Sequence, residues 1–231
     1  MNLTTEKINE LLGIKESYKA SDALMAILFD KEKREPTFKA FLEIEWRLDR
    51  DWFHAYFEEE HANKKKFAQD FTPDSISKLL SAIVGPGSNN LDVAAGTGSL
   101  MIQKWNHDRI SMSPFDYKPS MFLYQCEELS DRALPFLLFN LMIRGMNATV
   151  VHGDALTREA KQVYFIQNDL DDYMTFSSLN VMPHSKNVEK EFDIRKWIEE
   201  PIEHVESPIS IVDKYFKTYE PDEDSTQLSL F

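Results

Sequence analysis

The sequence predicts an α/β fold that is preceded by a helical segment. Residues 1–66 carry helix caps and an apolar stripe with helical spacing, whereas from about residue 70 short apolar strands alternate with helices. Such alternation is typical of a parallel sheet with crossover helices. The end of the sequence is acidic and polar, a composition that cannot bury enough apolar surface to fold. We therefore expect a helical segment at 1–66, an α/β domain at 67–212 and a flexible acidic tail at 213–231.

The N-terminal segment is predicted to form three helices. Thr4 or Thr5 can cap a short helix that ends at Gly13, and Ser21 begins a second. The third follows Pro36 and carries apolar residues at three- and four-residue steps, which places them on one side of a single long helix. These residues are Phe38, Phe41, Leu48, Trp52, Ala55 and Tyr56. The stripe must pack against another element.

The α/β part contains candidate strands and helices in alternation. The candidate strands are Asn90–Ala94, Phe122–Cys126, Ala148–His152 and Val163–Gln167. The candidate helices are Ser75–Val84, Ser99–Trp105 and Ser130–Arg144, the last closed by Gly145. Further along, Thr175–Leu179 is predicted as a strand and Val188–Glu199 as a helix.

Charge and cysteine content exclude several classes of function. The formal net charge is −13, so the chain lacks the basic surplus with which proteins that bind DNA alone neutralise phosphates. The run Lys64-Lys65-Lys66 is typical of a solvated surface. The single cysteine, Cys126, excludes an intramolecular disulfide and a Cys-rich zinc site. Because no long apolar stretch occurs, we expect a cytoplasmic protein without metal or membrane.

A glycine-rich loop lies between the first candidate strand and the helix that follows it. Asp92, Ala94, Gly96, Thr97 and Gly98 belong to this loop. Glycines let the backbone approach a ligand closely, and the helix amino terminus offers unpaired N–H groups. The loop therefore indicates a site for an adenosyl cofactor with an amino-acid tail, although a plain strand-to-helix turn has the same pattern.

Three neighbouring segments favour the cofactor site over the plain turn. The second candidate strand ends on Glu127-Glu128, where a carboxylate can accept hydrogen bonds from both ribose hydroxyls. Asp154 follows the third, where it can meet the exocyclic amine of adenine. Upstream, Phe71-Thr72-Pro73 precedes a helix and suits a lid over the methionine end.

In this order the motifs resemble the cofactor half of the adenine-N6 DNA methyltransferases, and most closely the modification subunits of type I restriction systems. The match also includes the helix end Asn140–Gly145 and the segment Gly153–Leu156, and covers roughly residues 60–156. The resemblance implies a Rossmann-like methyltransferase domain with S-adenosyl-L-methionine as cofactor. It implies these cofactor-binding residues: Phe71, Thr72, Pro73, Asp92, Ala94, Gly96, Thr97, Gly98, Glu127 and Asp154.

The catalytic signature of that family is missing from the chain. The family places Asn-Pro-Pro and an aromatic residue after its fourth strand, where they hold a flipped adenine. Two weaker candidates are Asn168, which follows the fourth candidate strand, and Asn180, which stands three residues before Pro183. We therefore expect no methylation of bare duplex DNA, and DNA contact that is indirect or depends on a specificity or methylase subunit.

The last five residues match the short motif by which bacterial proteins dock on the DNA polymerase sliding clamp. In this interpretation Gln227 and Leu228 begin the motif, and Leu230 and Phe231 fill an apolar pocket. The alternative is an apolar tail that folds back on the domain. Docking on a clamp that encircles DNA would compensate for the missing basic surface.

Three functions remain open at this point. The first is a cofactor-binding but degenerate methyltransferase that is recruited to the clamp. The second is an active adenine-N6 methyltransferase with a divergent catalytic loop. The third is a DNA-mimicking inhibitor that exploits the charge of −13.

Overall fold

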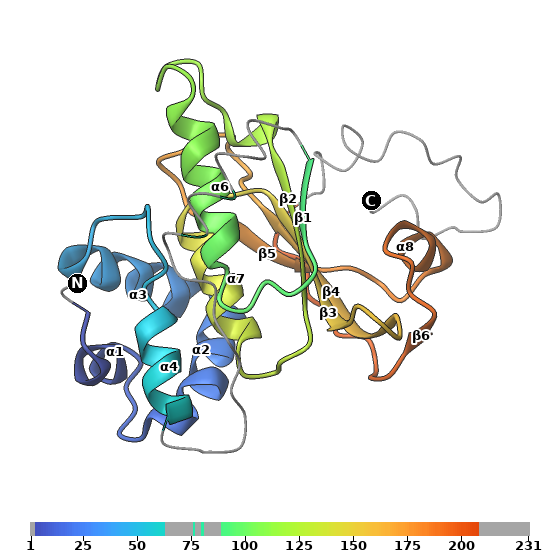
Figure 1. The fold of residues 1–231 in the computed structure, drawn as a ribbon, viewed down its shortest axis with the longest axis horizontal. Helices are drawn as coiled ribbons and strands as arrows, with labels where there is room; N and C mark the ends of the chain where they lie inside the picture. Colours follow the sequence, from blue (N-terminus) through green and yellow to red (C-terminus); the bar gives the residue numbers. More distant parts are fainter. Residues whose placement is uncertain (1–2, 63–75, 77–79, 81–88, 208–231) are drawn as a thin grey trace.

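The computed structural model describes residues 3–62, 76, 80 and 89–207 (Figure 1). Its helices are α1 (Thr5–Leu11), α2 (Ala20–Leu28), α3 (Lys31–Ile44), α4 (His54–Ala62), α6 (Ser99–Ile110), α7 (Leu134–Ile143) and α8 (Lys186–Glu191). Its strands are β1 (Asn89–Asp92), β2 (Leu123–Glu128), β3 (Ala148–Asp154), β4 (Glu159–Gln167), β5 (Ser178–Val181) and β6 (Lys196–Trp197). The predicted α/β class is confirmed.

The sheet is mixed rather than parallel throughout. Its described strands follow the order β1-β2-β3-β4-β5, with β6 beside β4. β1, β2 and β3 are parallel, whereas β4 runs antiparallel to both β3 and β5. The expectation that Val163–Gln167 continues a parallel sheet is wrong, because only residues 155–158 connect β3 to β4. A parallel crossover needs about a dozen residues or more, so the chain returns as a hairpin.

The N-terminal stripe is divided between two helices and the non-helical segment that joins them, which contains Leu48 and Trp52. α3 begins at Lys31, where the side chain of Asp30 caps it, and ends at Ile44 because Glu45 is extended (φ −138°, ψ 104°). α4 then begins at His54. The helix is interrupted because the backbone carbonyls of residues 48–50 accept hydrogen bonds from Arg144 and Gln103.

The N-terminal helices pack on α7 through an aromatic cluster. Phe38 and Phe41 of α3 contact Phe139 of α7 at ring-centroid distances of 4.8 and 4.9 Å. Phe53 contacts Phe136 and Phe139 at 4.8 and 5.1 Å. All five rings are fully buried, so the predicted burial of the stripe is confirmed for Phe38 and Phe41.

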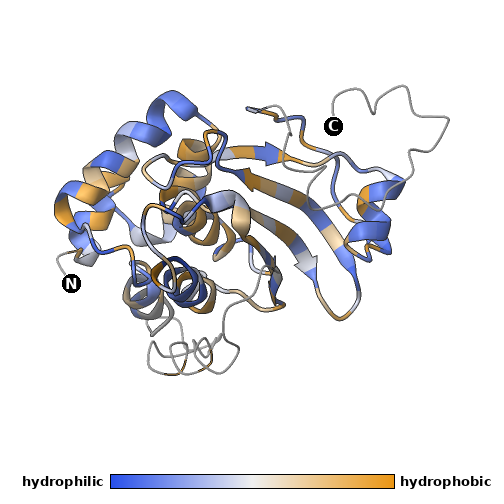
Figure 2. Ribbon diagram, turned by 90° about the horizontal axis from the view of Figure 1, so that it is seen from above, coloured by the Kyte–Doolittle hydropathy of each residue, from blue (hydrophilic) through white to orange (hydrophobic). Residues whose placement is uncertain are grey.

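Helices cover both faces of the sheet. α6 and α7 cover one face, and every residue of α7 is buried. The other face carries a smaller apolar cluster that includes Val151, Val163 and Ile194, with Val188 of α8 packed against it. Figure 2 shows the apolar colouring concentrated in the central helices and strands. Among the described residues, no helix is long and apolar enough to cross a membrane.

The segment after β5 differs from its prediction as a single helix. α8 ends at Glu191, the chain turns at Asp193 with φ +50°, and residues 196–197 form β6 beside the start of β4. The turn lets Ile194 join the smaller apolar cluster.

Candidate cofactor site

The glycine loop joins β1 to α6 in the conformation that its sequence requires. Gly96 and Gly98 have φ of +57° and +97°, values that L side chains rarely adopt. A Cβ on Gly98 would also lie 2.9 Å from Cδ1 of Leu137. Asp92 is half-buried at the end of β1, and its Oδ1 accepts a hydrogen bond from the amide of Ala94 at 3.2 Å. Burial raises the pKa of Asp92 above its ordinary value.

Glu128, at the end of β2, holds this loop. Its Oε2 accepts a hydrogen bond from the amide of Gly96 at 2.6 Å, and its Oε1 accepts one from the amide of Ser130 at 2.7 Å. Burial raises the pKa of Glu128, and the nearby carboxylate of Asp92 contributes to the same shift. The side chain of Glu128 therefore lies at the carboxyl edge of the sheet and binds the backbone of the glycine loop.

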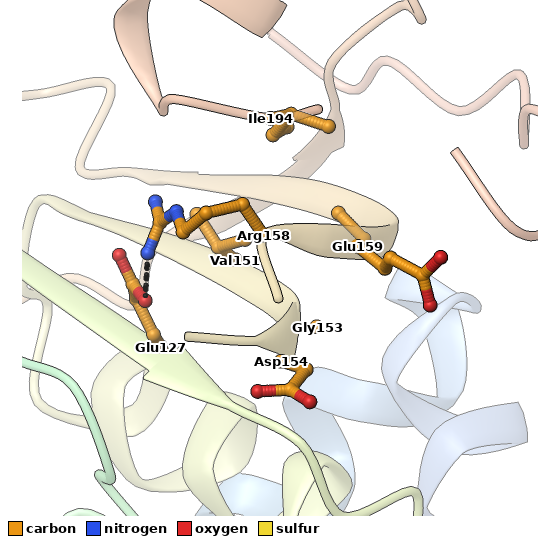
Figure 3. A pocket seen from close by; sticks show the side chains of 8 residues that line it. Glu127, Val151, Gly153, Asp154, Arg158, Glu159 and Ile194 are labelled. Atoms are coloured by element: carbon orange, nitrogen blue, oxygen red, sulfur yellow. Dashed lines mark hydrogen bonds and ion pairs between the residues drawn. The ribbon is translucent and has the colours of Figure 1, made fainter. Parts of the chain in front are cut away.

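Glu127 points to the opposite face of the sheet, because successive side chains of a strand alternate. Its Oε2 lies 2.8 Å from Nη1 of Arg158 (Figure 3). Arg158 stands in the turn between β3 and β4 and also donates to the carbonyl oxygen of Phe192. The structure thus brings the side chain of Glu128 to the glycine loop, whereas Glu127 contacts the loop only through its backbone carbonyl, which accepts from the amide of Ala95 at 3.0 Å.

Asp154 ends β3 at the same edge of the sheet. Its Oδ1 accepts hydrogen bonds from the amides of Leu156 at 2.8 Å and Thr157 at 3.4 Å, and these bonds lower its pKa. Glu127 and Asp154 line one small cavity of about 10 Å³, but their carboxylates point apart (Figure 3). Because β1, β2 and β3 are adjacent and parallel, Asp92, Glu128 and Asp154 follow one another along one edge.

Thr97 and Ala94 differ in their surroundings. Ala94 is exposed, whereas Thr97 is buried and its hydroxyl donates to the carboxylate of Asp51. Ser99, the first residue of α6, donates to the same carboxylate at 2.8 Å. The expected lid, Phe71-Thr72-Pro73, lies outside the described residues. The same is true of the expected helix Ser75–Val84, of which only residues 76 and 80 are described. The tail residues Gln227, Leu228, Leu230 and Phe231 also lie outside the described residues.

Asn168 lies away from the glycine loop. β4 is antiparallel, so its carboxyl end lies beside the start of β3, where Ile166 pairs with Ala148. The side chain of Asn168 is fully buried, and its Nδ2 donates to the carbonyl oxygens of Gly145 at 3.0 Å and Asp172 at 2.9 Å. These contacts hold the loop after β4 against Gly145.

Asn180 lies on the other side of the sheet. The path from β1 to β5 crosses four strand spacings of about 4.8 Å each, so β5 is roughly 19 Å from β1. Asn180 is fully buried: its Nδ2 donates to the hydroxyl of Ser207 at 3.0 Å, and its Oδ1 accepts from the amide of Glu206 at 2.9 Å. Neither asparagine is brought together with the glycine loop.

Sequence reasoning missed Asp51, and of the pair Glu127-Glu128 it chose the carboxylate that faces away from the loop. Glu128 stands next to Glu127, and the sequence does not show which of the two alternating side chains lies on the face of the loop. Asp51 lies some forty residues before the loop, within a stripe that helical spacing assigned to a single helix. Its position between Arg50 and Trp52 was the available signal, because a carboxylate in an apolar stripe needs buried donors.

Comparison with known proteins identifies the family. The N-6 DNA methylase family matches residues 51–204, more than half of the chain. A comparison with curated proteins gave no match. The family match begins at Asp51 and includes the glycine loop and the three strand ends around it. The chain belongs to the N-6 DNA methylase family.

Proposed function

We propose that this chain binds S-adenosylmethionine at the carboxyl ends of β1, β2 and β3. Members of the N-6 DNA methylase family use this cofactor. The observation that carries the proposal is the row of three carboxylates, Asp92, Glu128 and Asp154, at adjacent strand ends around a glycine loop. A ligand with one hydroxyl pair and one exocyclic amine matches such a row of acceptors.

The apolar residues beside these carboxylates fit an adenine ring. Leu129 follows Glu128 directly and is 60% exposed, and Leu156 stands two residues after Asp154 and is 90% exposed. A flat ring that covered these side chains would remove apolar surface from water. Together, acceptors and apolar surface fit an adenosyl group better than a purely polar ligand.

Glu128 replaces Glu127 as the proposed acceptor for the ribose hydroxyls. Glu128 already accepts the amide of Gly96, so a ribose bound there would lie against the glycine loop. Glu127 faces the other side of the sheet, where its carboxylate is paired with the partly buried Arg158. Glu128 is equally buried, at 6% against 7% exposed, so the choice rests on the face of the sheet and not on exposure. When bound, the cofactor would supply an electrophilic methyl group. This chain's own part is to bind and orient it.

We propose further that the chain is a degenerate or partner-dependent methyltransferase. An adenine amine must lie within reach of the methyl group for transfer. The buried positions of Asn168 and Asn180, and the hydrogen bonds that occupy both side chains, support the absence of a working base-binding motif.

Two other functions compete with this proposal. An active adenine-N6 methyltransferase with a divergent loop is favoured by the family match itself. A DNA mimic is favoured by the charge of −13, but a mimic has no need of an adenosyl site. Transfer of labelled methyl groups to DNA separates the first competitor from our proposal.

The proposed partners rest on sequence alone. The motif Gln227–Phe231 supports recruitment to the bacterial sliding clamp, which would bring the chain to DNA without a basic surface. The order of motifs supports a relationship to type I modification subunits, and with it a specificity or methylase subunit as a second partner.

Calorimetric titration of the full chain with S-adenosylmethionine and with its demethylated product tests the cofactor proposal. We expect one saturable site for each ligand, with thermal protection of the fold by mass action. Absence of both heat and protection with both ligands would contradict the proposal.

A further inference from the structure

The carboxylate of Asp51 joins the N-terminal segment to the glycine loop. Its Oδ2 accepts hydrogen bonds from the hydroxyls of Thr97 and Ser99, the two residues on either side of Gly98. Its Oδ1 accepts from the amide of Phe53 at 2.9 Å. Asp51 is 4% exposed, so these bonds form away from water.

α7 holds the same carboxylate from the other side. Nδ2 of Asn140 donates to Oδ1 of Asp51 at 2.9 Å and to the carbonyl oxygen of Thr97 at 2.8 Å. Arg144, one turn further along the chain, donates to the side-chain oxygen of Asn140 at 2.9 Å. Asp51 therefore has four donors, and one of them also binds the loop backbone.

The backbone around Asp51 is fixed as well, which explains the break between α3 and α4. Arg144 donates to the carbonyl oxygens of Leu48 at 2.9 Å and Arg50 at 2.7 Å. Gln103 of α6 donates to the carbonyl oxygen of Asp49 at 2.6 Å. In a continuous helix these carbonyls would accept intrahelical bonds. The segment is instead shaped to present one carboxylate to the loop.

We propose that Asp51 is a positioning residue of the cofactor site, which acts by fixing the glycine loop at Gly98. The inference rests on the proposed cofactor binding and assigns to Asp51 no contact with the ligand. Gly98 has φ +97°, and the hydroxyls before and after it are held by one buried oxygen. A site that is preorganised in this way avoids the free-energy cost of ordering the loop when the ligand binds.

The test compares Asp51→Asn with two matched controls in the full chain. Asp49→Asn changes a nearby carboxylate that is 36% exposed and lies 3.6 Å from Nε of Arg50. Phe41→Leu destabilises the same apolar core, where its ring packs against Trp52, Phe53 and Phe139, and removes no donor to the carboxylate of Asp51. Two measurements are made: the dissociation constant for S-adenosylmethionine, and amide hydrogen exchange of residues 95–99 without ligand.

We expect Asp51→Asn to weaken cofactor binding by roughly tenfold or more and to accelerate exchange of residues 95–99. Asp49→Asn should change neither quantity. Phe41→Leu should lower the melting temperature with little effect on the dissociation constant. If exchange of the loop in Asp51→Asn equals that of the wild type, or if Phe41→Leu weakens binding as much as Asp51→Asn, the inference is overturned.

A second pair of variants serves if Asp51→Asn does not fold. Thr97→Val and Ser99→Ala each remove one donor to Oδ2 and leave the carboxylate with its remaining partners. Each should accelerate loop exchange, and unchanged exchange in both would overturn the inference. If the wild type binds no cofactor but exchange still responds, the proposed function fails, and only the fixing of the loop by Asp51 stands.

Discussion

The side chain of Glu128 accepts a hydrogen bond from the amide of Gly96 at 2.6 Å, so the second strand of the sheet directly supports the loop that follows the first. The neighbouring residue, Glu127, is paired with Arg158 on the opposite face. Two adjacent carboxylates therefore have different tasks. One contributes to the candidate cofactor site, and the other joins β2 to the β3–β4 turn.

Substitution of Asn168 by alanine should destabilise the fold and leave cofactor binding unchanged. The change removes the side-chain donor to the carbonyl oxygen of the buried Gly145, which costs about 1–3 kcal/mol. Urea unfolding measures the loss, and calorimetry the cofactor affinity. The control is Asn106→Ala, since the side chain of Asn106 accepts a bond from Arg109 on its own helix. Unchanged stability, or weakened cofactor binding without a loss of stability, would contradict the structural role of Asn168.

The purified chain should not methylate bare duplex DNA. Asn180 is buried in β5 and bonded to Ser207, so it has no free amide for a flipped adenine. Labelled methyl transfer to unmethylated DNA, with and without sliding clamp, is the measurement. Robust labelling that Asn180→Ala abolishes would identify a working catalytic loop and reject the degenerate assignment.

Cofactor affinity should fall on acidification because of Glu128. Burial raises the pKa of Glu128, so this carboxylate is protonated at a higher pH than an ordinary glutamate; it then loses its charge, and one of its two oxygens becomes a donor. We expect weaker binding as the solution is taken from about pH 7.5 to about pH 5, and a flatter profile for Glu128→Gln.

Acidification should increase the contribution of Glu128 to folding stability, although it weakens cofactor binding. A carboxyl pKa that is higher in the folded state than in the unfolded state means that the folded state binds more protons in that interval. Its contribution to stability is therefore complete below the unfolded pKa and is lost as the pH rises through the folded pKa. The unfolding free energy of the wild type minus that of Glu128→Gln should decrease with rising pH, and an increase would contradict the raised pKa.

The tail should bind the bacterial sliding clamp without the folded domain. A peptide Asp222–Phe231 contains the whole motif, and we expect micromolar affinity, about −8 kcal/mol, because little area is buried and the peptide must be ordered. Leu230→Ala with Phe231→Ala should abolish binding, as measured by fluorescence anisotropy, and leave cofactor affinity intact. If neither peptide nor full chain binds at tens of micromolar, recruitment by this motif is rejected.

The sequence predicted the α/β class and the glycine loop because both depend on local patterns. The positive φ values of Gly96 and Gly98 follow from residue type and spacing. By contrast, the direction of β4 depends on the length of the connection after Asp154, and a strand pattern does not show direction. The break between α3 and α4 depends on Arg144, almost a hundred residues away, because its guanidinium binds carbonyls that a helix would use.

The most direct test of the account is the cofactor dissociation constant of Glu128→Gln beside that of Glu127→Gln. These matched substitutions change adjacent side chains on opposite faces of β2. Losing a charged acceptor typically costs about 1.5–3 kcal/mol, so Glu128→Gln should bind S-adenosylmethionine roughly 10- to 100-fold more weakly. Glu127→Gln should lower the melting temperature through its pair with Arg158 and keep near wild-type affinity. Loss of affinity in Glu127→Gln with full affinity in Glu128→Gln would contradict the assignment, and absence of binding by the wild type would contradict the cofactor site itself.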